Sequence, residues 1–554
     1  MEFYGLTLRS AALLVVVGLL AAGCGSESPV TESAPSGDAP RAAAPHPEQG
    51  LIEGLVLSSR MLARPELNVI GAQGHVSVRS QTNPNHYYIS RYVSAGLVST
   101  SDIIENDLDS KPVNGPRSDE FEEIYLHGEI YKARPDVMAV VHAHPPETIA
   151  FSVSSVPLMD GDTAVPVWDI RPVNKGQAGI VNTPELGRSL SQALGSNESI
   201  LLLGHGVVVT SRSLSGVVSG ASGLVGTARL QQMLISMGGK ADLNPRRVIA
   251  QPNQAPQPPP QPVPIVPVAN ELSPGGTGGG QRGWDLMKRL VLKENGGSIP
   301  TTTPAGPQKA ATPEAAVRQD LVFASRMLAS QELGILDFAG HVSVRSPSDP
   351  NRYLISRWSA PADATPEGII ENNLDSVAIS GARRDEYREA FMHGEIYKTR
   401  PDVMAIVHAH TPEVVAFTQS SVQLRPVSNG GRFIGAGLPI FDIRQFHPRA
   451  SIIDSPELGK ALASVLGNNP GVLLKGHGFT LTDSSVYGLV SRAYNLRMNA
   501  LIQQQAIKLG GRIAYLDGQV STTPPQPVVP TGNGGGRGAD RTWEYWLRVL
   551  PLNE

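Results

Sequence analysis

The feature that most constrains the fold of this chain is an internal duplication. The segment SRMLARPELNVIGAQGHVSVRS at residues 59–80 returns as SRMLASQELGILDFAGHVSVRS at residues 325–346, 266 positions later. The same offset relates HGEIYKARPDVMAVVHAH at 127–144 to HGEIYKTRPDVMAIVHAH at 393–410. Only two copies are found, so the pattern indicates a tandem pair of domains and not a solenoid of many stacked repeats. A length of 554 residues also exceeds what one hydrophobic core usually serves.

The segments outside the two copies are recognised by their amino-acid composition. Stretches rich in proline and glycine cannot build a core, and each is followed by a short amphipathic sequence, GWDLMKRLVL at 283 and TWEYWLRVLP at 542. We therefore predict a signal peptide at 1–24, a disordered tether at 25–49, domain one at 50–250, a Pro/Gly-rich segment with a short helix at 251–312, domain two at 313–520, and a Pro/Gly-rich tail with a short helix at 521–554.

The amino terminus predicts export. Arg9 precedes an apolar run that is too short to span a bilayer comfortably, and small residues lead to Cys24. This arrangement resembles a bacterial lipoprotein signal, so we expect Cys24 to be lipidated and the protein to be anchored to the cell envelope by lipid alone. An ordinary secretory signal or an uncleaved anchor are the alternatives. Cys24 is the only cysteine, which excludes an internal disulfide, and a net charge of −4 gives no reason to expect nucleic acid as a partner.

Helical and strand patterns alternate within each copy. Residues 51–64 and 119–133 have the spacing of apolar positions that is typical of helices. The runs HVSVR, VMAVVHAH and SILLLGHGVVV are short and rich in β-branched residues, as strands are. The sequence therefore predicts an α/β fold, with a central sheet covered by helices in each copy.

Paired histidines mark the same place in both copies. In a strand, residues two apart point the same way, so His142 and His144 can reach one cation. His205, between two glycines in LLLGHGVVV, is a third candidate ligand. Copy two offers His408, His410 and His477 in the same settings. Three imidazoles with one position left open are typical of a catalytic zinc-type site.

A carboxylate accompanies the histidines. Glu123, His127 and Tyr131 are spaced i, i+4, i+8 and would share one helix face, with Glu389, His393 and Tyr397 at the matching positions. We expect Glu123 and Glu389 to be catalytic. His127 and His393 are candidates for catalysis or for a hydrogen-bonded place in the core, and we expect the two tyrosines to serve packing.

Together these motifs resemble the class II aldolase/adducin superfamily over most of both copies. The resemblance lies in GHVSVR, in the glutamate 19 residues before the first histidine of HxH, in RPDVMAVVHAH and in the distant GHG. It implies three-layer α/β/α domains. It also implies that the three histidines of each domain bind one divalent metal ion, usually zinc, with iron or manganese as alternatives. By the same resemblance, Glu123 and Glu389 would be the catalytic acid/base residues. Active sites between subunits of a ring-like tetramer would make this chain a homodimer of pseudo-tetrameric form.

Departures from the family pattern narrow the substrate. Sugar-phosphate aldolases of this family carry Gly-Asn where this chain has His75 and His341 after glycine, so these two histidines are candidate substrate-binding residues. Glu122 would repel a phosphate. The blocks IIENDLDS and PIFDIR look closer to decarboxylases of hydroxylated aromatic acids. We therefore expect a metal-dependent lyase that decarboxylates such an acid or cleaves a non-phosphorylated aldol. The alternatives are an adducin-like binding module and an iron-dependent oxygenase or epimerase.

One loop distinguishes the copies. Copy two has QLRPVSNGGRFIGAGLPIFDIR, seven residues longer than PLMDGDTAVPVWDIR in copy one, and includes Asn429, Arg432 and Phe433. Copy one offers Asp160 and Asp162 instead. We expect Arg432 to bind an anionic substrate in copy two, which would make copy two the main catalytic domain, unless the loop is a variable surface segment without a role.

Overall fold

The computed structural model describes residues 46–113, 120–238, 279–303, 307–308, 310–379, 386–516 and 537–550. The predicted signal peptide with Cys24, most of the tether and most of both Pro/Gly-rich stretches lie outside these residues. Within the described part of the chain, no helix is long and apolar enough to cross a membrane. The duplicated region from Glu48 onward clusters as one unit.

A seven-stranded sheet organises copy one. Its order is β3-β2-β1-β4-β9-β8-β7, and every neighbouring pair is antiparallel except β7 and β8. The strands are β1 (His75–Arg79), β2 (His86–Ser90), β3 (Ile103–Asp107), β4 (Ala139–Ala143), β7 (Val167–Trp168), β8 (Ser199–Leu202) and β9 (Gly206–Ser211), with β5 (Met159–Asp160) and β6 (Thr163–Ala164) forming a separate hairpin.

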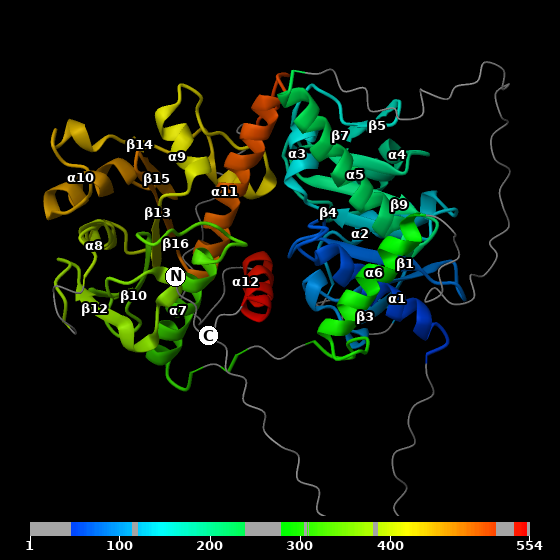
Figure 1. Cartoon of the computed structure of the whole chain (residues 1–554), viewed down its shortest axis with the longest axis horizontal. Helices are drawn as coiled ribbons and strands as arrows, with labels where there is room; N and C mark the ends of the chain where they lie inside the picture. Colours follow the sequence, from blue (N-terminus) through cyan, green and yellow to red (C-terminus); the bar gives the residue numbers. More distant parts are fainter. Residues whose placement is uncertain are drawn as a thin grey trace, which may run out of the picture. The chain divides into compact units, whose positions relative to one another are not determined.

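Helices cover both faces of this sheet (Figure 1). Alternation along the buried strands decides which residue meets which layer. Val141 packs in a core with α1 (Gln49–Ala63) and α5 (Leu214–Ser236), whereas Val140 packs in a second core with α2 (Ile124–Ala133) and α4 (Pro184–Leu194). The remaining helices are α3 (Pro146–Val153) and α6 (Gly279–Glu294). His142 lies two residues after Val140 and therefore faces the α2 layer.

Copy two repeats this architecture. Its sheet has the order β12-β11-β10-β13-β16-β15-β14, and its two cores lie on opposite faces as in copy one. The strands are β10 (His341–Arg345), β11 (Arg352–Ser356), β12 (Ile369–Asn373), β13 (Ala405–Ala409), β14 (Ile440–Phe441), β15 (Gly471–Leu474) and β16 (Gly478–Asp483). The helices are α7 (Pro313–Ala329), α8 (Ala390–Thr399), α9 (Pro412–Gln419), α10 (Pro456–Leu466), α11 (Val486–Lys508) and α12 (Arg537–Val549). The prediction of two tandem α/β/α domains is confirmed.

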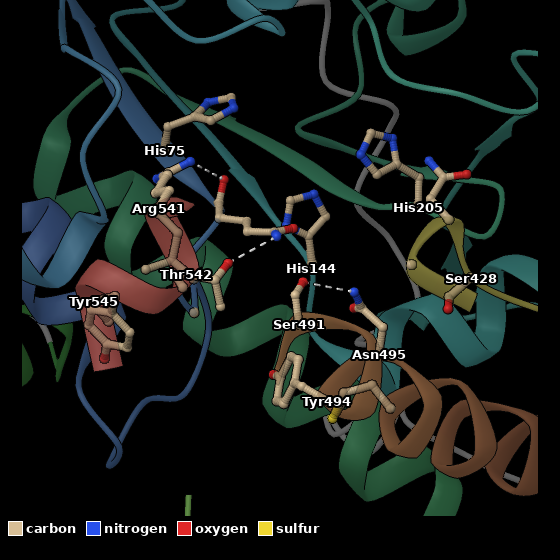
Figure 2. Close-up of a pocket in the computed structure, with 18 of the residues that line it drawn as sticks. His75, His144, His205, Ser428, Ser491, Tyr494, Asn495, Arg541, Thr542 and Tyr545 are labelled. Atoms are coloured by element: carbon tan, nitrogen blue, oxygen red, sulfur yellow. Dashed lines mark hydrogen bonds between the residues drawn. The ribbon is translucent and has the colours of Figure 1, made fainter. Parts of the chain in front are cut away.

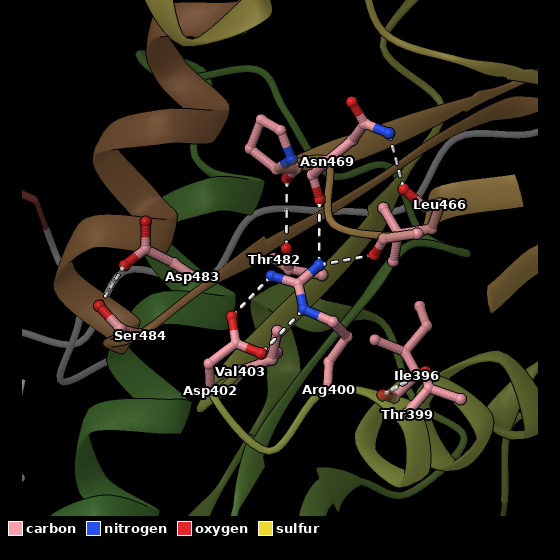
Figure 3. Close-up of polar contacts among 12 residues, drawn as sticks. Ile396, Thr399, Arg400, Asp402, Val403, Leu466, Asn469, Thr482, Asp483 and Ser484 are labelled. Carbon is pink, nitrogen blue, oxygen red and sulfur yellow. Dashed lines mark hydrogen bonds and ion pairs between the residues drawn. The ribbon is translucent and has the colours of Figure 1, made fainter. Parts of the chain in front are cut away.

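An arginine fixes the approach to the histidine strand (Figure 3). Arg400 ends α8 before a proline and donates to both carboxylate oxygens of Asp402, at 2.8 and 2.7 Å. It also donates to the carbonyls of Gly467 at 2.8 Å and Asn469 at 3.3 Å, which follow α10. In copy one, Arg134 makes the same four contacts to the matching residues. This contact holds the end of one helix, the end of its neighbour and the start of the histidine strand together.

Two predicted elements differ from the structure. The helix expected at 119–133 begins only at Ile124, because Glu123 takes the N-cap position and stands outside the helical backbone. The run SILLLGHGVVV is not one strand but a hairpin of β8 and β9. Gly204 adopts φ +63° at the turn between them, a conformation that glycine reaches without strain. His205 therefore lies on a tight turn and not within a strand.

Apolar side chains of the two copies pack against each other. Residues Ile149, Ala150 and Val153 of α3 pack with Ile502 and Ala506 of α11 in a common buried cluster. Helix α12 belongs to copy two, because its tryptophans join the α7–α11 core there. Residues of α11 and α12 also line the cavity described below.

Candidate metal centre

Four side chains of copy one converge on one point. His142 comes from β4, His144 follows the last residue of that strand, His205 lies on the β8–β9 turn, and Glu123 caps α2. One ligand atom of each lies within 4.8 Å of those of the others. The structure thus brings together the three predicted ligands of copy one and the predicted acid/base. The second cluster contains Glu389, His408, His410 and His477, with the same spacing limit.

Local geometry explains the GHG motif. A Cβ atom on Gly206 would collide with the carbonyl of Ala143 and lie 3.0 Å from Cδ2 of His144. Gly478 has the same surroundings at Ala409 and His410. The glycine after the third histidine therefore lets the hairpin pass close to the histidine strand, which brings the third imidazole to the other two.

The donor set fits a divalent metal. In copy one, Nδ1 of His142 donates to the carbonyl of Val207 at 3.1 Å, which leaves Nε2 with a lone pair. That Nε2 is buried and has no hydrogen-bond partner. The Glu123 carboxylate lies 3.4 Å from Nε2 of both His142 and His205. Imidazole and carboxylate donors around an open position suit zinc and also iron(II).

The ligand nitrogens also converge in copy two. Nε2 of His410 lies 3.0 Å from Nε2 of His408 and 3.1 Å from Nε2 of His477. On the other side of its ring, Nδ1 of His410 lies 3.0 Å from Asp337 Oδ1. A carboxylate behind a ligand histidine orients the ring toward a metal. Residue 71, at the matching position of copy one, is glycine, so this contact is special to copy two.

The two glutamates differ in electrostatics. Burial acts to raise the pKa of Glu123, but the neighbouring His205 and His142 together hold it well below its usual value. Burial raises the pKa of Glu389, and the N–H of Ile453 opposes this only in part. Each glutamate accepts a backbone hydrogen bond at 3.1 Å, from Val181 and Ile453 respectively, so one carboxylate oxygen is fixed in both copies.

A buried hydrogen-bond chain runs behind the cluster. Nδ1 of His75 lies 2.8 Å from Nε2 of His127, whose Nδ1 lies 2.6 Å from Ser77 Oγ. The Ser77 hydroxyl lies 2.8 Å from the hydroxyl of Tyr131. Burial lowers the pKa of His127 to about 3 and that of His75 well below its usual value, so both rings are neutral at pH 7. His341, Ser343, His393 and Tyr397 form the same chain in copy two.

This hydrogen-bond chain bears on the roles predicted for His75, His127 and Tyr131. His75 lines the cavity of copy one, as a substrate-binding residue must, whereas His127 is fully buried behind it and does not. A proton transfer directly from His127 to a substrate does not fit this position, because His75 lies between them. Tyr131 is hydrogen-bonded as well as packed. Ser77 was missed, although it follows His75 by two residues on one strand and therefore shares its face.

A cavity of about 690 Å³ opens onto the first cluster (Figure 2). Glu123, His144 and His205 line it, and so does the exposed Glu122. Other walls come from copy two: Tyr494 and Asn495 of α11, and a group from α12 that includes Arg541, Thr542 and Tyr545. The volume suits a small organic molecule. The first cluster is therefore served by both halves of the chain.

Part of the loop that is longer in copy two lies at the cavity of copy one, where the sequence had predicted a role in copy two. Its residues Ser428, Asn429 and Gly430 line the cavity of copy one. Asn429 donates from Nδ2 to the carbonyl of Gly179, at 2.7 Å, and from its backbone to Gly204. Arg432 is not among the residues that line this cavity, and burial lowers its pKa.

The two aspartates that were expected to repel an anion in copy one lie away from its cavity. Asp160 and Asp162 are exposed on the separate β5–β6 hairpin and do not line the cavity. The cation on the wall of copy one is Arg541, and the anion beside the ligands of copy two is Asp337. No local pattern in the sequence could connect Arg541 to His75, because the contact depends on how α12 folds back.

The structure thus contains two tandem α/β domains, each with a glutamate and three histidines that could hold a metal ion around one point. The model of the Class II Aldolase and Adducin N-terminal domain matches residues 53–232 and 319–504, and the chain belongs to this family. This confirms the resemblance seen in the sequence.

Individual relatives match one copy at a time. Decarboxylase tropJ of Talaromyces stipitatus is 31% identical in an alignment 239 residues long, and the match covers 39% of this chain and 88% of that protein. The 3,4-dihydroxyphthalate decarboxylase of Rhodococcus jostii is 31% identical over 209 residues, 35% of this chain and 82% of that protein. Among solved structures, the L-fuculose 1-phosphate aldolase from Glaciozyma antarctica is 20% identical, with a TM-score of 0.34 over 44% of this chain and 92% of that chain.

Proposed function

We propose that the chain is a divalent-metal-dependent lyase that decarboxylates a hydroxylated aromatic acid. The observation that carries this proposal is the convergence of Glu123, His142, His144 and His205 beside a cavity large enough for such an acid; all but His142 line this cavity. Both relatives described above have decarboxylase in their names, and each is covered over most of its length by one copy of this chain.

The metal would be held by the three histidines of each copy, one ion per domain, and we propose zinc as the native ion. When bound, a divalent cation supplies electrophilic stabilisation of negative charge on a substrate oxygen. The His142 ring is already turned for this task, because Val207 accepts the hydrogen bond from its other nitrogen.

Glu123 is the proposed acid/base of copy one. One of its oxygens is fixed by the N–H of Val181, and the residue lines the cavity. In decarboxylation, the bond from the ring carbon to the carboxylate breaks, and the carbon keeps the electron pair and must gain a proton. A carboxylate in this position can take the proton of the substrate hydroxyl and return it to that carbon, and the phenolate oxygen that remains takes a proton from water to give the phenol. Glu389 would do the same in copy two.

His75 is proposed to bind a substrate oxygen through Nε2. His127 holds Nδ1 of His75, so the ring can present Nε2 to the cavity in one orientation. His127 is thus a positioning residue. In copy two, Nε2 of His341 is buried and has no hydrogen-bond partner, which suits a nitrogen that awaits a ligand.

Aldol cleavage of a non-phosphorylated substrate is the second candidate, because it would use the same cluster and the same carboxylate. Glu122 on the cavity wall disfavours a phosphorylated substrate in copy one by charge repulsion. An adducin-like binding module would not need the four converging side chains, which are present in both copies. An iron-dependent oxygenase or epimerase is distinguished by the metal that the purified protein contains.

The decisive experiment is an assay of the purified chain loaded with zinc, manganese or iron(II). Hydroxylated aromatic acids, 3,4-dihydroxyphthalate among them, would be offered together with non-phosphorylated aldol substrates. Carbon dioxide release with formation of the decarboxylated phenol supports the proposal. Aldehyde release without carbon dioxide would favour the second candidate, and a metal-loaded protein that turns over neither class would end both.

We further propose that the protein is lipid-anchored through Cys24 and assembles as a dimer of tandem chains. Labelling with a radioactive fatty acid tests the first point, since Cys24→Ala should abolish the label. Light scattering of the protein without its signal peptide tests the second, and a monomeric mass would contradict it.

A further inference from the structure

The arginine on the wall of the first cavity comes from the far end of the chain. Helix α12 is anchored in copy two, where Trp543 stacks on Tyr487 at 4.3 Å between ring centroids and Trp546 packs against Tyr494 at 5.1 Å. One turn of the same helix then presents Arg541 and Thr542 to copy one. In Figure 2, Arg541 lies beside His75, across the cavity from His205.

Copy one receives Arg541 with specific contacts. The guanidinium donates to the carbonyl of Gln73 at 3.0 Å and to that of Gly74 at 2.9 Å, immediately before His75. Its Cζ lies 4.5 Å from the ring centroid of Phe121 and 5.0 Å from that of Tyr92. The guanidinium thus packs against two neighbouring aromatic rings, and the two carbonyls fix its direction.

Its charge is not neutralised by an ion pair. Arg541 is only 6% exposed, and its Nε has no hydrogen-bond partner. Among the ion pairs of the described residues, none includes Arg541; Glu123 acts on it only at longer range. Burying a guanidinium without a paired anion is costly, because desolvation is not repaid by Coulomb attraction. Burial accordingly lowers the pKa of Arg541 to about 10, and the group stays charged at neutral pH.

We infer that Arg541 is the carboxylate-binding residue of the first cavity, so that the acid group of an aromatic ligand of copy one is recognised by the last helix of copy two. A guanidinium matches a carboxylate by charge and by its planar fork of donors. Phe121 and Tyr92 add apolar faces for an aromatic ring. The inference rests on the proposed function for its substrate class, but it concerns binding and can be tested without turnover.

The test compares two ligands that differ in charge. Binding of 4-hydroxybenzoate and of the neutral 4-hydroxybenzamide is measured by calorimetry on the full zinc-loaded chain that carries His408→Ala and His410→Ala, which restricts metal-assisted binding to copy one. We expect the acid to bind at least tenfold more tightly than the amide. Arg541→Met should weaken the acid at least tenfold and change the amide less than twofold, and Arg541→Lys should restore part of the preference.

The matched control is Arg548→Met, which removes a cation from the same helix where it pairs with Glu544, away from the cavity. It should keep the preference for the acid. Metal content and melting temperature of each variant show whether α12 remains docked. An acid affinity that survives Arg541→Met, an equal loss for acid and amide, or a full chain without preference for the acid would overturn the inference. Absence of decarboxylation with an intact acid preference would instead count against the proposed reaction alone.

Discussion

Asp337 Oδ1 lies 3.0 Å from Nδ1 of His410, whereas the matching residue of copy one is Gly71. The carboxylate turns the His410 ring so that Nε2 faces His408 and His477. Copy one lacks this support and has the cation Arg541 on its cavity wall. Each cluster has one glutamate and three histidines. We nevertheless expect the cluster of copy two to bind a metal ion with higher affinity than the cluster of copy one.

Removal of the Asp337 carboxylate should weaken metal binding in copy two. Outer-shell carboxylates of this kind typically contribute about 10- to 100-fold in affinity. The effect of Asp337→Ala on metal affinity is measured by competition with a chelator. The chain also carries His142→Ala and His144→Ala, so that only the second centre binds metal. Asp337→Asn keeps an acceptor oxygen for the imidazole and should lose less. Equal affinities for all three chains would show that Asp337 does not support the metal.

Each copy is expected to hold one ion independently. Replacing His142 and His144 together with alanine should remove about half of the bound metal, because the ligands of copy two are untouched. Elemental analysis of the purified protein gives the ratio directly. The matched variant, His408→Ala with His410→Ala, should remove the other half. A wild-type chain that binds no metal at any reasonable concentration would contradict the whole interpretation of the clusters.

Glu123→Gln should abolish most turnover in copy one while the metal stays in place. The amide is nearly isosteric and can still accept from Val181, but it cannot carry a proton, and loss of a general acid/base typically costs about 10² to 10⁴ in rate. The rate is measured in a chain that also carries His408→Ala and His410→Ala, so that only copy one contributes. Glu185→Gln, at an exposed position of α4, is the control. Glu389→Gln is the equivalent change in copy two. An unchanged rate would assign the proton transfer to another group.

Copy one is expected to carry most of the activity toward an aromatic acid. This reverses the expectation from the loop sequence, because Asn429 and Arg541 both line the first cavity. One assay compares His142→Ala/His144→Ala with His408→Ala/His410→Ala. The first pair should lose most of the turnover and the second should keep most of it. The opposite result would restore copy two as the main catalytic domain.

The buried His393 should make the protein less stable in mild acid. Burial lowers its pKa to about 3, whereas a histidine in an unfolded chain titrates near 6.5. Between these values the unfolded state binds a proton that the folded state does not, so the free energy of unfolding falls as the pH falls. From pH 7.5 to 5.0 the loss from this residue should be about 2 kcal/mol.

Urea unfolding at the two pH values measures this effect. His393→Gln removes the titrating group, so its loss of stability between pH 7.5 and 5.0 should be smaller than that of the wild type by about the same amount. The other histidines are common to both proteins and cancel in the comparison. Identical pH dependence of the two proteins would show that His393 does not contribute.

The sequence predicted what depends on local spacing. Period-two alternation placed His142 and His144 together, and the duplication doubled every ligand, so both clusters and the fold class could be inferred. The position of His205 on a turn depended on the backbone of Gly204, which a β-branched run conceals. Arg541 could not be found, because its role depends on the packing of Trp543 and Trp546 and not on any spacing near the cluster.

The place of Arg541 near the carboxyl end also sets an order in time. During synthesis, every ligand of both centres and the whole sheet of each copy emerge before α12 does. A chain that has not yet been completed can therefore fold two domains and load metal while the wall of its first cavity is still missing. Binding of an acid by the first centre would then report that α12 has been synthesised and has docked. A chain that is truncated before α12 would retain both clusters of ligands but lose Arg541 from the wall of the first cavity.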